Sequence, residues 1–76
     1  MNHSYYVVMI DYGSKGREAI VDPEITRREV IARIKSGEYR TINFIHHIDT
    51  DSGCVTDVTN EFLKEAGFYE RETVDA

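Results

Sequence analysis

The first apolar stretch of the chain, residues 4–12, predicts a β-strand. It is dense in aromatic and β-branched residues and contains neither glycine nor proline. A strand with one face in water alternates apolar and polar residues, but here both sets of alternate positions are apolar. One face therefore meets a partner, or the protein itself covers both faces. The odd set is Tyr5, Val7 and Met9, and the even set is Tyr6, Val8, Ile10 and Tyr12.

The next segments predict a hairpin followed by a helix. Residues 13–16 form a Gly-containing turn, and residues 17–21 read as the returning strand. Thr26 and Glu29 have the spacing of a capping box, so a helix should begin near Arg27 and end before Gly37. An alternative start, with Asp22 as the cap and Pro23 in the first turn, makes this helix about one turn longer. Its predicted apolar stripe is Val30, Ile31 and Ile34.

Residues 40–49 predict a third strand, with one core face and one wet face. Its even positions are Ile42, Phe44, His46 and Ile48, its odd positions include Thr41, Asn43, His47 and Asp49, and only Ile45 breaks the alternation. The even set is therefore expected to face the core. This register predicts that His46 is buried and His47 is exposed.

The remainder of the chain predicts a short hairpin and a second helix. Residues 50–53 form a turn, residues 54–58 a returning strand, and residues 59–66 a helix that Gly67 ends. The order is ββαββα, which predicts an α+β, small two-layer sandwich: a mostly antiparallel sheet with two helices packed on one face. Residues 1–68 form a single domain, and residues 69–76 are an acidic, frayed C-terminal tail.

Size and composition favour a small soluble protein. The 76 residues suffice for one domain, 41% of them are apolar and 30% are charged, and no apolar run approaches the about 20 residues of a membrane span. The beginning of the sequence has no basic leader before an apolar stretch, which predicts a cytoplasmic protein. The single cysteine, Cys54, cannot form an intramolecular disulfide, and we expect it to be a half-buried strand residue.

The net charge of −5 is unevenly distributed. Residues 1–40 carry a net charge of +1 and residues 41–76 a net charge of −6. Because a nucleic-acid backbone rewards clustered Lys and Arg, this balance makes a nucleic-acid partner unfavourable. A protein partner, or a second copy of the chain, is expected instead.

Candidate metal and nucleophile motifs are incomplete. Neighbouring residues of a strand point to opposite faces, so His46 and His47 cannot ligate one ion, and His47 with Asp49 gives only two ligands. Residues 49–53 begin like a calcium loop, but Gly53 comes one position early and Asn60 stands where a bidentate Glu is needed. We therefore predict neither a metal nor a cofactor.

One stretch resembles a known family. His46, His47, Gly53 and the segment Phe62-Leu63-Lys64-Glu65-Ala66-Gly67-Phe68 resemble the second half of HicA-type toxins, which have a catalytic histidine, a Gly-containing hairpin and a closing helix. The resemblance implies a ribonuclease with a double-stranded-RNA-binding-like fold and with His46 or His47 as its catalytic residue. The chain departs from the pattern because it lacks the leading helix and is acidic where those ribonucleases are basic.

The function that we predict from these observations is a small non-enzymatic protein-binding or regulatory module. It could act as an acidic inhibitor of nucleic-acid-binding machinery, with carboxylates standing where phosphates would bind. The outward set of the first strand is expected to form a homodimer interface or a docking site, unless the second helix or the tail covers it. The alternative is the HicA-like ribonuclease. The predicted partner-binding residues are Tyr5, Val7, Met9, Asp49 and Asp51.

Overall fold

The computed structural model describes residues 3–68 of the protein, so the predicted tail at 69–76 lies outside the described residues. The α+β fold and the ββαββα order are confirmed. Within residues 3–68, neither helix has the length and apolar character needed to cross a membrane. The elements are β1 (Ser4–Asp11), a 3-10 turn (Gly13–Lys15), β2 (Arg17–Val21), α1 (Arg27–Lys35), β3 (Ile42–Asp49), β4 (Cys54–Asp57) and α2 (Thr59–Glu65).

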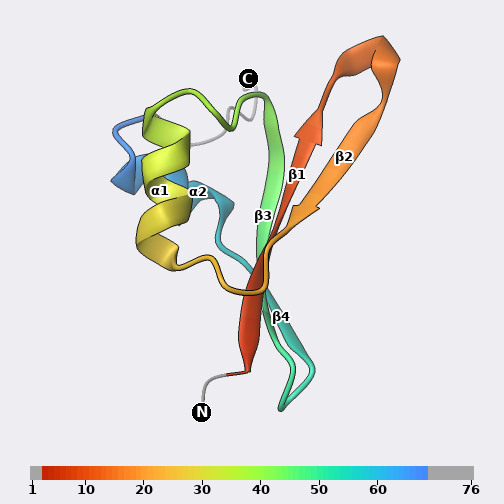
Figure 1. The fold of residues 1–76 in the computed structure, drawn as a ribbon, viewed down its shortest axis with the longest axis vertical. Coiled ribbons are helices and arrows are strands. Elements are labelled where there is room, and N and C mark those ends of the chain that lie inside the picture. Colours follow the sequence, from red (N-terminus) through yellow and green to blue (C-terminus); the bar gives the residue numbers. More distant parts are fainter. Residues whose placement is uncertain (1–2, 69–76) are drawn as a thin grey trace, which may run out of the picture.

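The four strands form one antiparallel sheet in the order β2-β1-β3-β4, and both helices lie on the same face of it (Figure 1). The two hairpins are staggered: β2 pairs with Val7–Asp11 of β1, whereas β4 pairs with His46–Asp49 of β3. The hairpins therefore extend from opposite ends of the central β1–β3 pair and give the molecule a long axis of 40 Å.

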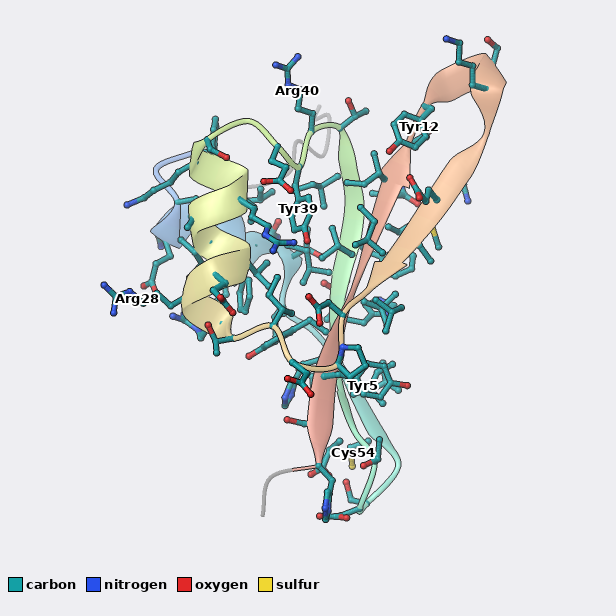
Figure 2. All side chains as sticks on the ribbon, viewed as in Figure 1. Tyr5, Tyr12, Arg28, Tyr39, Arg40 and Cys54 are labelled. Carbon is teal, nitrogen blue, oxygen red and sulfur yellow. The ribbon has the colours of Figure 1, made fainter. Side chains whose placement is uncertain are left out.

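The hydrophobic core lies between the helices and the even-numbered side of β1. The α1 helix begins at the predicted capping box, in which the Glu29 backbone N–H donates to Thr26 Oγ1 and the Thr26 backbone N–H donates to the Glu29 carboxylate. Tyr39, in the connection to β3, fills the space between α1 and β3 (Figure 2). The buried apolar residues are Val8, Ile10, Val30, Ile31, Ile34, Tyr39, Ile45, Phe62 and Ala66.

The predicted register of β3 is wrong. Ile45, the residue that broke the alternation, lies opposite Val8 and is fully buried under the helices, whereas Phe44 lies opposite Met9 on the other face. A β-bulge explains the difference: the pairing passes from Met9–Phe44 directly to Ile10–Ile42, which leaves Asn43 as an extra residue. The bulge returns Ile42 to the core side, as predicted, and places Phe44, His46 and Ile48 on the face away from the helices.

The histidine assignments change with the register. His47 lies on the helix side, where its ring centroid is 5.0 Å from that of Tyr6, and His46 lies on the opposite face. Both side chains are half-buried. The prediction of a buried His46 and an exposed His47 is therefore wrong, although the two rings do point to opposite sides of the sheet.

A buried threonine connects the start of α2 to the middle of β3. Thr59 is 0% exposed, and its Oγ1 accepts a hydrogen bond of 2.8 Å from the backbone N–H of Ile45. The Asp57 carboxylate accepts from the backbone N–H of Thr59 at 2.9 Å, and the Val58 N–H donates to the Ile45 carbonyl oxygen. These bonds hold the first turn of α2 against the sheet.

We expect Thr59→Val to destabilise the protein by about 1–3 kcal/mol, because the isosteric side chain leaves the buried N–H of Ile45 without its acceptor. Thr59→Ser, which retains the hydroxyl, is the matched control and should lose less free energy of unfolding than Thr59→Val. Urea denaturation of both variants measures the difference. Equal losses for Val and Ser would mean that the hydrogen bond contributes no more to stability than the methyl group does.

Thr41 is the one non-glycine residue with a positive φ in the described part of the chain, at 52°. A β-branched residue is strained in this left-handed conformation. Its carbonyl oxygen accepts a hydrogen bond from the Asp11 N–H, which ties the start of β3 to the end of β1. The conformation is therefore held by the pairing of the two strands.

We expect Thr41→Gly to stabilise the protein by about 1 kcal/mol, since relief of strain exceeds the added freedom of the unfolded chain. Thr41→Ala keeps the Cβ atom and should show a smaller gain. Thermal denaturation compares the two variants with wild type. A destabilised Thr41→Gly variant would show that the Thr41 side chain contributes more than the strain costs.

Candidate functional site

The face of the sheet away from the helices carries the largest set of aligned apolar side chains in the described structure outside the core. We call it the open face, because within residues 3–68 both helices cover the opposite side (Figure 1). Residues paired across antiparallel strands point to the same side, so the pairing defines its rows. The rows are Tyr5–Ile48–Val55, then Val21–Val7–His46–Asp57, then Ala19–Met9–Phe44.

The outer positions of the open face are strongly exposed and its centre is half-buried by its own neighbours. Val55 is 57% exposed and Val21 is 48% exposed, on the two edge strands. The rings of Phe44 and His46 stack with a centroid separation of 3.9 Å. Tyr5 extends from β1 on the side of the sheet away from α1 (Figure 2). The open face thus has an apolar and aromatic centre.

Charged groups are few on the open face and are placed at its margins. Asp57 is the only carboxylate in the three rows, and it accepts hydrogen bonds from the N–H and hydroxyl of Thr59. Arg17 lies beyond the rows, directly opposite Asp11 on the neighbouring strand. The face therefore has almost no net charge, although the whole chain has a net charge of −5.

The structure places the five predicted partner-binding residues in two locations. Tyr5, Val7 and Met9 lie side by side on the open face. Asp49 and Asp51 lie at the end of the β3–β4 hairpin, where the Asp49 carboxylate accepts from the Asp51 N–H and the Asp51 carboxylate lies 3.0 Å from Nδ1 of His3. The carboxylates are thus engaged locally and do not join the apolar rows.

The helix side of the sheet contains His47 in an aromatic environment. The Tyr6 ring lies between His47 and Phe62, with centroid separations of 5.0 Å and 5.2 Å. Burial raises the pKa of the Tyr6 hydroxyl, and the nearby Arg27 guanidinium partly opposes this rise. This packing accounts for the position of His47 without a chemical role.

Arg27 joins the two helices. Its guanidinium donates to the carboxylates of Glu65 at 2.5 Å and Glu61 at 2.9 Å, and these bonds raise the pKa of Arg27. It also lies 5.0 Å from the centre of the Phe62 ring. The basic side of α1 is therefore partly neutralised by α2.

The chemical candidates do not converge on one site. His46 and His47 lie on opposite faces of β3, so they cannot form an acid–base pair on one substrate. In the described part of the chain, no group of three or more His, Cys, Asp or Glu residues is placed to hold a metal ion. Cys54 is exposed on the edge strand, contrary to the half-buried position that we expected.

The sequence did not predict a groove that lies beside the start of β3, between α1 and the end of α2. Its volume is about 470 Å³, its lining is mostly apolar, and the Arg40 side chain on its wall donates to the Gly37 carbonyl oxygen at 2.9 Å. The other lining residues are Ile34, Tyr39, Thr41, Ile42, Leu63 and Phe68. Arg40 is the only titratable group apart from Tyr39 in this lining, so the groove offers no acid–base pair.

The contribution of β3 to the open face was also not predicted from the sequence. Phe44 and Ile48 were assigned to the core, but they extend the surface of Tyr5, Val7 and Met9 across the sheet. The available signal was Ile45, an apolar residue at a position predicted to be wet.

No family model, no curated protein and no solved structure matches the chain.

Proposed function

We propose that this protein is a non-enzymatic binding module that recognises a folded protein partner through the open face of its sheet. One observation carries the proposal: apolar side chains are aligned across all four strands on a face that neither helix covers. Contiguous apolar surface of this kind on a soluble domain marks a contact site. Tyrosine, phenylalanine and methionine, all present here, are enriched in such contacts.

The chemistry of the open face favours a protein over a nucleic acid. Aromatic side chains on a sheet can stack on bases, but single-stranded nucleic acids also require a basic groove along the backbone. Arg17, a basic residue beside the rows, lies opposite the acidic Asp11 on the neighbouring strand, and the rows themselves contain no Lys or Arg. An apolar and nearly neutral protein surface complements this face better than a polyanion does.

The proposal does not depend on the acidic half of the chain. Inhibition of nucleic-acid-binding machinery would require carboxylates that are free to replace phosphates, whereas Asp49 and Asp51 are engaged in the hairpin turn. The ribonuclease alternative stays a prediction. It requires RNA cleavage that is lost in either His46→Ala or His47→Ala, and we expect the wild-type protein to show no such cleavage.

The test is capture of a partner by matched variants. Tagged wild-type, Val55→Lys and Thr56→Lys proteins are incubated with native cell extract containing an untagged copy of the chain, and the retained proteins are identified by mass spectrometry. Val55 and Thr56 are adjacent exposed residues of β4, but only Val55 is on the open face. We expect wild type and Thr56→Lys to retain the same protein and Val55→Lys to lose it. Equal retention by all three would contradict the proposal.

A further inference from the structure

We infer that the partner of the open face is a second copy of this chain, packed sheet against sheet in a two-fold dimer. This inference rests on the proposed function and names its partner. In each copy both helices lie on one face of the sheet (Figure 1), so the dimer has four layers, with two sheets in the centre and a pair of helices on each outer side. Face-to-face packing of sheets with interdigitating side chains is a standard way to bury such surfaces.

Charge complementarity favours self-association. A basic partner would need carboxylates to contact, and an acidic partner would need cations, but the three rows contain only His46 and Asp57 as ionisable groups. The partner surface that fits is therefore also apolar and nearly neutral, and the open face of a second copy has this composition. Its charge-poor centre and charged margins match the usual arrangement of a dimer interface.

The area of the open face is sufficient for a weak dimer. With strands about 4.8 Å apart and outward side chains about 6.7 Å apart along each strand, the rows cover a flat area on the order of 300 Å². Side chains that stand above the sheet add to this value, so two copies bury on the order of 1,000 Å² in total, near the lower limit for specific interfaces. We therefore expect a reversible dimer that dissociates on dilution.

Within residues 3–68, the fold leaves the face accessible to a second copy. Both helices are on the opposite side of the sheet, and Arg28 on α1 points away from it (Figure 2). A two-fold axis brings the same patch of both copies together, so each apolar row meets an apolar row. The stacked Phe44–His46 pair lies near the centre, where aromatic residues contribute most to binding.

Sedimentation equilibrium over protein concentrations from about 1 µM to about 1 mM tests the inference, because this range spans the affinity of a weak interface. We expect wild type and Thr56→Lys to be in a monomer–dimer equilibrium with the same dissociation constant. Val55→Lys and Val7→Lys should raise that constant at least about tenfold, since each places a charge in the apolar contact. Thermal denaturation of dilute samples verifies that the variants fold. If Val7→Lys does not fold, Val55→Lys still tests the inference, because Val55 is 57% exposed and its replacement should not disturb the core.

The dependence of the dimer dissociation constant on salt concentration provides a second test. Each copy has a net charge of −5, so raising NaCl from about 0.05 M to about 0.5 M should tighten the dimer by screening the repulsion between copies. Weakening by salt would contradict an apolar contact. A wild type that is monomeric up to about 1 mM, or a dimer that Val55→Lys and Val7→Lys leave unchanged, overturns the inference. If the chain is monomeric but captures a different protein in a Val55-dependent way, the proposed function stands and only the identity of the partner is wrong.

Discussion

Phe62→Ala should reduce the free energy of unfolding by about 3–5 kcal/mol, the largest loss that we expect from a single substitution. Phe62 is 1% exposed and joins three parts of the structure: α2, the Tyr6 ring of β1 and the Arg27 guanidinium of α1. Truncation leaves a cavity among residues that backbone hydrogen bonds hold in place. For a domain of this size, such a loss is a large part of the total stability.

The matched control is Phe68→Ala. This residue has the same side chain and lies shortly after the end of α2, but it is 50% exposed. Its replacement should cost about 1 kcal/mol or less, because little apolar area returns to water. Urea denaturation midpoints give both values. If the two substitutions had equal effects, α2 would not be packed on the sheet through Phe62.

Ile45→Ala should reduce the free energy of unfolding by about 2–5 kcal/mol, and Phe44→Ala by only about 1 kcal/mol. The two residues are neighbours on β3 and point to opposite faces: Ile45 is 0% exposed beneath the helices, and Phe44 is half-buried on the open face. Although its side chain is smaller, Ile45 is therefore expected to contribute more than Phe44 to the free energy of unfolding. The opposite order is what a regular strand without the bulge would give.

Measurements at low and high protein concentration separate the contribution of Phe44 to folding stability from its contribution to association. Denaturation of dilute samples measures the monomer, where the order Ile45 above Phe44 should be clear. At high protein concentration, Phe44→Ala should also weaken association, because its ring lies near the centre of the open face. If Phe44→Ala cost more than Ile45→Ala in dilute solution, the β3 register would be wrong.

Local signals in the sequence predicted much of the fold. The capping box of Thr26 and Glu29 set the start of α1, and the glycines at 13, 16 and 53 marked the two hairpin turns. Each of these signals depends on residues within a few positions of one another. The order of elements and the placement of both helices on one face followed from them, together with the short connections.

The orientation of β3 could not be predicted from local signals. Strict alternation assigned Ile42 and Phe44 to the same face, whereas the Asn43 bulge puts them on opposite faces. The bulge arises where β3 pairs with β1 near the strained Thr41, so it depends on contacts between distant parts of the chain. The apolar residues on both sides of β1 predicted that one face meets a partner or that the protein covers both, but they did not reveal which residues of β3 share the open face.

The most direct measurement of the central claim is a dilution series followed by methyl-group NMR. Resonances of Val7, Met9, Ile48 and Val55 on the open face should shift together between about 1 mM and about 10 µM, with a common midpoint. Those of Val30, Ile31 and Ile34, which α1 buries in the core, should stay constant. Constant open-face resonances over the whole range, or shifts confined to the helix side, would contradict self-association through this face of the sheet.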